Sequence, residues 1–121
     1  MTGKKQSGDR GEAVAAAYLR KQGYTVLETQ FRTRRGEIDI IARSPENILC
    51  FVEVKTRKDD SFAQAREFVT PAKQRRIRAA AQMYLVLRAD MDTLCRFDVA
   101  EVYSGDGKTA PRLNYIAQAF D

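Results

Sequence analysis

The sequence contains no histidine, and this absence excludes several classes of catalytic site. Without histidine there is no Ser-His-Asp triad, no Cys-His pair, no histidine-ligated zinc site and no nuclease with a histidine base. Cysteine is also scarce, and no CxxC motif occurs. Cys50 and Cys95 lie in apolar, strand-like contexts and are interpreted as buried small hydrophobic residues, not as a disulfide or metal pair. Any catalysis must therefore use carboxylate, lysine, tyrosine or arginine side chains.

Long apolar runs are lacking too. The longest, residues 48–52 and 83–87, are far too short to span a bilayer, and the basic segment MTGKKQSGDR has no apolar core like that of a secretory signal. We therefore expect no membrane association and a cytoplasmic location. The 121 residues, 44% hydrophobic and 31% charged, are typical of one globular domain. The net charge of +5 is compatible with a nucleic-acid partner but does not establish one.

Hydrophobic periodicity and turn residues predict the element order α-β-β-β-α-β-β. Residues 1–8 are expected to form a flexible leader, and residues 9–121 the domain. One helix is predicted over residues 10–22, ended by Gly23, and another over residues 71–88, with Thr70 as N-cap before Pro71. Strands are predicted over residues 24–31, 36–42, 48–57, 94–102 and 113–119. This order predicts a single α/β domain with a mixed central sheet flanked by helices.

The two strands within residues 36–57 form the most apolar stretch of the chain, yet they carry three charged residues. These are Asp39 on the first strand and Glu53 and Lys55 on the second. Burying charges without partners is costly, so their position requires an explanation. On the first strand, alternation predicts one face formed by Ile38, Ile40 and Ala42.

Two carboxylates on neighbouring strands suit a hard cation such as Mg²⁺ or Mn²⁺. Glu53 and Lys55 share a face of their strand, roughly 6.6 Å apart at the usual rise. The lysine would then lie close to a substrate phosphate or an attacking water. Such a site can hydrolyse a phosphodiester bond and needs no histidine. An alternative is that Asp39 and Lys55 form a structural ion pair.

Basic residues gather in two further segments. The turn before residue 36 carries Arg32, Arg34 and Arg35, and the second helix opens on a strongly basic stretch. Cations oppose the positive end of a helix dipole, which favours an anionic ligand there. Either cluster could instead be an ordinary solvated surface. Asp98 and Glu101 are expected to face solvent or to pair with arginine.

Asp39, followed fourteen residues later by Glu53-Val54-Lys55, resembles the metal-binding signature of the PD-(D/E)XK nuclease superfamily. In detail the chain resembles the YraN-like family of small bacterial proteins. The resemblance covers RGEAVAAAYLRKQGY, FRTRRGEIDIIA, FVEVKTR, VTPAKQRRIRAAAQMYL and RFDVAEV. The superfamily's nominal Pro-Asp is Ile38-Asp39 here, a change that removes no ligand.

The resemblance implies a restriction-endonuclease-like fold, similar to archaeal Holliday junction resolvases. It implies a deoxyribonuclease, an endonuclease dependent on Mg²⁺ or Mn²⁺ that acts on DNA, including branched or junction DNA. Asp39, Glu53 and Glu12 would be metal ligands, with the Val54 carbonyl as a further candidate, and Lys55 the catalytic lysine. Nucleic-acid contacts are expected from the basic segments and their neighbours: Arg32, Arg34, Arg35, Arg57, Lys73, Gln74, Arg75, Arg76 and Arg78.

Several alternatives remain open at this level. Glu12, three residues after Asp9, could simply complete a capping box at the start of the first helix. The chain could be a non-catalytic nucleic-acid-binding module, a nuclease for RNA, or an adaptor for an acidic partner. A homodimer is a further hypothesis, because a junction cutter benefits from two active sites. The loop at residues 58–69 is expected to contact substrate.

Overall fold

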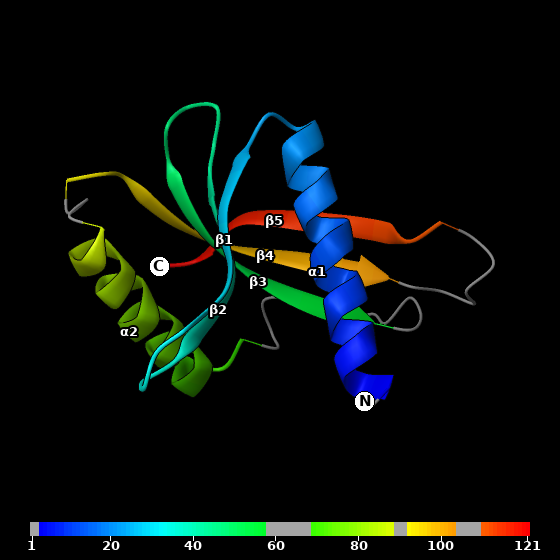
Figure 1. Ribbon diagram of the computed structural model, residues 1–121, viewed down its shortest axis with the longest axis horizontal. Helices are drawn as coiled ribbons and strands as arrows, with labels where there is room; N and C mark the ends of the chain where they lie inside the picture. Colours follow the sequence, from blue (N-terminus) through cyan, green and yellow to red (C-terminus); the bar gives the residue numbers. More distant parts are fainter. Residues whose placement is uncertain (1–2, 58–68, 89–91, 104–109) are drawn as a thin grey trace.

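The computed structural model describes residues 3–57, 69–88, 92–103 and 110–121, without the side chains of residues 3–9. Its elements follow the predicted order α-β-β-β-α-β-β (Figure 1). They are α1 (Gly3–Lys21), β1 (Thr25–Arg32), β2 (Glu37–Arg43), β3 (Leu49–Arg57), α2 (Pro71–Leu87), β4 (Cys95–Tyr103) and β5 (Arg112–Phe120). Of the predicted substrate-contacting loop, residues 58–68 lie outside the described residues. Neither described helix is long and apolar enough to cross a membrane.

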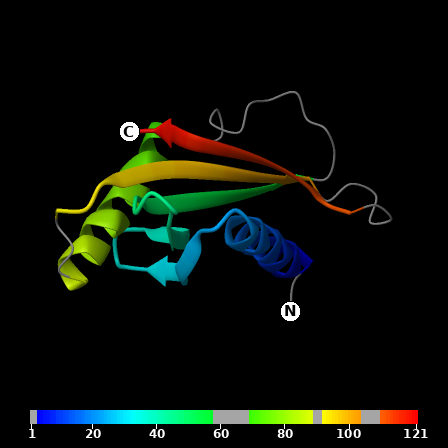
Figure 2. The ribbon, with the colours of Figure 1, turned by 90° about the horizontal axis from the view of Figure 1, so that it is seen from above.

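The strands form one sheet in the order β1-β2-β3-β4-β5. Only β3 and β4 run parallel; the other neighbouring strands are antiparallel. The predicted mixed sheet is thus confirmed. A parallel pair needs a crossover connection, and α2 lies within the segment between β3 and β4. Figures 1 and 2 show α1 and α2 well apart from each other.

Each helix packs on its own hydrophobic cluster, and β3 contributes alternate residues to both. Leu49 and Phe51 join the cluster under α2, whereas Cys50 and Val52 join the cluster under α1. All four side chains are fully buried or nearly so. The period-2 alternation of a strand explains this division. It places Glu53 on the same side of the sheet as Phe51, the side that α2 covers.

The ends of the helices follow local chemistry. Thr70 caps α2, with its hydroxyl accepting from the Lys73 N–H at 3.2 Å, and Pro71 occupies the first turn. Gly23 ends α1 with a φ of 90°, in the left-handed region that favours glycine. However, α1 begins at Gly3, inside the predicted leader of residues 1–8. Glu12 therefore lies in the helix interior, and the capping-box interpretation is wrong.

The predicted shared face of β2 is also wrong in part. Ile40 and Ala42 pack in the cluster under α1, but Ile38 packs in the cluster under α2. The side chains of Ile38 and Ile40 therefore lie on opposite faces of the sheet, and the change of face occurs at Asp39. The neighbouring strand is irregular at the same level, because Gln30 has a φ of 51°. Such irregularities bend a strand and re-aim its side chains.

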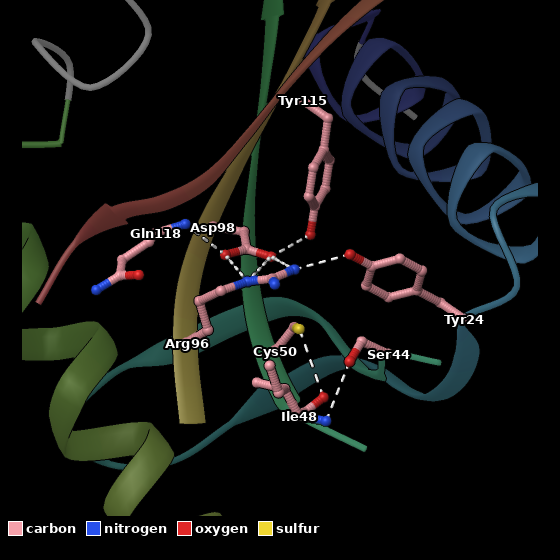
Figure 3. A network of polar contacts seen from close by, with 8 residues as sticks. All are labelled: Tyr24, Ser44, Ile48, Cys50, Arg96, Asp98, Tyr115 and Gln118. Carbon is pink, nitrogen blue, oxygen red and sulfur yellow. Dashed lines mark hydrogen bonds and ion pairs between the residues drawn. The ribbon is translucent and has the colours of Figure 1, made fainter. Parts of the chain in front are cut away.

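Two acidic residues of β4 are buried and paired with arginine. Asp98 is fully buried, and its Oδ1 lies 2.9 Å from Arg96 Nε. The same carboxylate accepts from the Tyr115 hydroxyl and the Gln118 N–H, and Arg96 Nη2 donates to the Tyr24 hydroxyl at 2.7 Å (Figure 3). This network ties β4 to β5 and to the start of β1. Of the two expectations for Asp98, pairing with arginine is confirmed, and exposure to solvent is not observed because the side chain is buried.

The second buried acid of β4 is Glu101. Its Oε2 lies 2.9 Å from Nε of Arg57 at the end of β3. Neither cysteine takes part in a disulfide. Cys50 is buried as expected, whereas Cys95 at the start of β4 is exposed.

Candidate active site

The candidate site lies where β2 and β3 separate. Their paired ladder ends at Ile40 and Val52. One step further on, Asp39 Oδ2 accepts a hydrogen bond from the Val54 N–H at 2.7 Å. A side-chain carboxylate thus takes the place of a backbone acceptor from the neighbouring strand. The two strands diverge at this point and bring the carboxylates of Asp39 and Glu53 next to each other.

The environment of Asp39 disfavours its ionised form. Burial, and then the neighbouring charge of Glu53, raise the pKa of Asp39 from 3.8 to about 7, although the hydrogen bond from the Val54 N–H acts in the opposite direction. Two adjacent carboxylates in a partly buried position repel each other. A cation bound between them would relieve this repulsion.

Two lysines from different elements meet the carboxylates. Lys73, in the first turn of α2, has its Nζ 3.2 Å from Glu53 Oε1. Burial, and then contact with Lys73, lower the pKa of Lys55 to about 8. Burial alone would also lower the pKa of Lys73, but its contact with Lys55 and the charge of Glu53 outweigh this and raise it. Lys55 is therefore the amine that releases its proton nearer to neutral pH.

An open pocket of about 310 Å³ lies beside these side chains. It is lined by Glu37, Glu53, Thr70, Ala72, Lys73, Arg76 and Ile77. The pocket joins a carboxylate to the N-terminal turn of α2, where backbone N–H groups and basic side chains favour an anion. A substrate phosphate could approach Glu53 and Lys73 through it.

Glu12 reaches this region indirectly. Its Oε2 accepts a hydrogen bond from Gln30 Nε2 at 3.1 Å. Gln30 lies on β1 between residues that pair with Ile38 and Ile40, which places it beside Asp39. Its left-handed backbone is sterically costly for a residue other than glycine, and such conformations gather at functional sites. The sequence carries no signal for the position of Gln30.

The carboxylates fit a hard metal ion. Within the described part of the chain, no group of three or more histidine, cysteine, aspartate or glutamate residues lies close enough to hold a metal. Mg²⁺ needs no such group, because it keeps several water ligands and is bound through one or two carboxylates and substrate phosphates. Asp39 and Glu53 supply these oxygen donors. Glu12 contacts Gln30, which lies beside Asp39 in the sheet.

Several residues predicted to contact nucleic acid have partners within the protein. Arg57 pairs with Glu101, as described above. Arg78 Nη1 donates to the backbone oxygen of Asp121 at 2.6 Å, and Gln74 Nε2 donates to the Val69 carbonyl at 2.9 Å. These contacts hold the end of β3, the C-terminal residue and the segment just before α2. Arg75 is exposed on α2.

Comparison with known proteins identifies the family of this chain. The model of the "Uncharacterised protein family UPF0102" matches residues 11–102, a span that contains Asp39, Glu53, Lys55 and Lys73. The chain belongs to the UPF0102 family. This is the YraN-like family whose motifs the sequence reproduces, a PD-(D/E)XK nuclease-like group.

Curated relatives are similar to this chain over almost all of its length. The UPF0102 protein of Acetivibrio thermocellus is 45% identical over 121 residues, which cover 97% of this chain and 92% of the relative. That of Pelobacter propionicus is 43% identical over 118 residues, covering 97% and 84%. That of Alkaliphilus metalliredigens is 42% identical over 116 residues, covering 96% and 98%. None of these names states an activity.

Proposed function

We propose that this protein is a metal-dependent endonuclease that hydrolyses phosphodiester bonds in DNA, including branched or junction DNA. One observation supports the proposal above others. Where β2 and β3 separate, two carboxylates, Asp39 and Glu53, meet two lysines, Lys55 and Lys73, beside an open pocket. This combination of hard oxygen donors and amines suits phosphodiester hydrolysis without histidine.

Each side chain has a role in this proposal. Asp39 and Glu53 would hold Mg²⁺ or Mn²⁺, with the Val54 carbonyl as a further donor. The bound ion would supply positive charge to the phosphate and a lowered pKa to a water ligand. Lys55, whose pKa is lowered to about 8, would orient the attacking water or accept its proton. Lys73 would face the phosphate oxygens from α2.

Cleavage assays test the proposal. Purified protein is incubated with linear, nicked and four-way-junction DNA, and with RNA of matched sequence, in Mg²⁺, Mn²⁺ or EDTA. Cleavage of DNA is expected only with metal. It should fall at least about 100-fold in Lys55→Met and Glu53→Gln variants, because each removes a group acting on the transition state.

Matched controls separate the site from general charge effects. Glu46→Gln and Lys21→Met change an exposed carboxylate and an exposed lysine outside the site, and should cleave as the unmodified protein does. No cleavage of any substrate, with DNA binding retained by Lys55→Met, would reject the enzyme in favour of a binding module. Cleavage restricted to RNA would reject the proposed substrate.

We also propose that the protein acts on junctions as a homodimer, because two strands must be cut. Light scattering with four-way-junction DNA should then give the mass of two chains on one junction. A single chain on each junction, at concentrations that support cleavage, would contradict the dimer without affecting the nuclease.

A further inference from the structure

The turn between β1 and β2 packs directly on the backbone of α2. A Cβ atom at Gly36 would lie 2.0 Å from the carbonyl oxygen of Arg76, so only glycine permits this approach. The turn is also held internally by Thr33. Its hydroxyl accepts from the N–H groups of Arg35 and Gly36, both at 3.1 Å, and its own N–H donates to the Gly36 carbonyl at 2.8 Å. The junction between turn and helix is therefore a built feature of the fold.

This junction joins the two basic segments that are separate in the sequence. Together they surround a pocket of about 290 Å³, lined by Arg32, Thr33, Arg34, Arg35, Gly36, Glu37 and Arg76. Four of these residues are arginines and one is acidic. Arg32 Nε lies 3.2 Å from Glu37 Oε2. Within the described residues, Arg34, Arg35 and Arg76 form no ion pair, so their mutual repulsion favours an anion in the pocket.

The arginine pocket adjoins the candidate active site. It shares Glu37 and Arg76 with the 310 Å³ pocket that contains Glu53 and Lys73. We call the combined surface of Arg32, Arg34, Arg35, Arg76 and Lys73 the basic groove. This surface extends from the site toward the β1–β2 turn. That turn is at the lower left of Figure 1.

At the C-terminal end of β3, the last described basic residue has an acidic partner. Lys55 is followed on β3 by Arg57, whose guanidinium pairs with the buried Glu101. That ion pair neutralises the cation nearest to the C-terminal end of β3. Within the described residues, the basic groove lies on the turn side of the site.

We propose that the basic groove binds the phosphodiester backbone of a nucleic-acid strand as it continues from the candidate active site toward the β1–β2 turn. Guanidinium groups match phosphate oxygens with two parallel hydrogen bonds, and contacts of this kind position a strand without reading its bases. The assignment of one end of the groove rests on the proposed nuclease function. The groove itself rests on the contact between Gly36 and Arg76.

Salt-dependent binding tests this inference. The affinity for fluorescein-labelled duplex and single-stranded DNA is measured by anisotropy in EDTA, over a series of salt concentrations. An Arg34→Ala/Arg35→Ala variant is compared with an Arg20→Ala/Lys21→Ala control, which removes the same charge from exposed positions at the end of α1. Each lost phosphate contact lowers the slope of log K against log salt by about 1. The groove variant should therefore lose a slope of about 2, and the control should keep the original slope.

A Gly36→Ala variant tests the geometry without changing any charge. The added methyl group would meet the Arg76 carbonyl and must displace the turn from α2. We expect weaker DNA binding, with folding checked by thermal melting. If this variant does not fold, the double arginine variant alone decides.

The possible outcomes separate the groove from the nuclease. An equal loss of salt-dependence slope in the groove variant and the control would show that net charge alone drives binding, and would overturn the groove proposal. A protein that cuts DNA, with unchanged binding by the groove variant, would also overturn it while leaving the nuclease in place. Weakened binding by the groove variant of a protein that cuts nothing would support the groove and reject the nuclease.

Discussion

Replacing Asp39 with asparagine should stabilise the metal-free protein at pH 8, although Asp39 belongs to the candidate active site. Burial and the charge of Glu53 raise the pKa of Asp39 from 3.8 to about 7, so the folded protein holds this proton more tightly than the unfolded chain. Between about pH 4 and pH 7 only the folded state keeps the proton, and stability falls as the pH rises. Above about pH 7 Asp39 is ionised in both states, and the full destabilisation that its burial and the charge of Glu53 cause is present.

The size of the effect follows from this change. A rise from 3.8 to about 7 corresponds to roughly 4 kcal/mol, at ~1.4 kcal/mol for each tenfold change in proton affinity. Asparagine has the same shape, carries no charge and keeps an oxygen that can accept from the Val54 N–H. We therefore expect the free energy of unfolding to rise by about 2–4 kcal/mol at pH 8. Near pH 4 the difference should approach zero.

Urea unfolding in EDTA, followed by far-ultraviolet circular dichroism, measures the free energy of unfolding at pH 8 and near pH 4. Asp98→Asn is the matched comparison, because it makes the same substitution at a carboxylate that is fully paired. Leaving Arg96 without its buried partner should cost about 3–5 kcal/mol, the opposite sign. An Asp39→Asn variant no more stable than the unmodified protein at pH 8, or a stabilisation independent of pH, would refute the reasoning.

Three further predictions concern neighbouring features. A Lys73→Met variant should bind Mn²⁺ more tightly by up to about fivefold in titration calorimetry, because Lys73 no longer competes for Glu53; equal or weaker binding would argue against competition. A Phe51→Ala variant should lose about 3–5 kcal/mol of unfolding free energy in urea, since Phe51 is buried against Tyr84 and Phe97, and a smaller loss would indicate collapse of the cavity. Thr70→Ala should cost about 1 kcal/mol in the same assay by removing the cap of α2, while Thr70→Ser should cost less.

Much of the fold could be predicted because its signals are local. Alternation along β3, the Thr70-Pro71 start of α2 and Gly23 after α1 each depend on residues a few positions apart. Errors arose where a local pattern had two explanations. The first helix is predicted to begin at residue 10, but α1 begins at Gly3. The apolar alternation of β2 predicts one face, but the strand turns over beside the irregular Gln30.

The candidate site could be predicted only in part for the same reason. Asp39, Glu53 and Lys55 were identified because charge within an apolar hairpin is costly, and because their spacing resembles a known signature. Lys73 is predicted to contact nucleic acid, and the structure adds a contact with Glu53 that the sequence does not reveal. The structure likewise pairs Arg57 with the buried Glu101, a contact that no local pattern predicts. Residues far apart in the chain, whether on a helix and a strand or on two strands, meet through packing, which no local pattern records.

The sequence by itself therefore determined the order of the elements, the ends of the helices near Thr70 and Gly23, and the charged trio of the central hairpin. These follow from backbone preferences and from the cost of burying charge. Only the tertiary structure decided which groups meet. Lys73 contacts Glu53, Gln30 contacts Glu12, and the β1–β2 turn packs on α2 at Gly36. Ion pairs, pKa values and the basic groove depend on distances of a few ångströms. Those distances are set by how the helices pack on the twisted sheet.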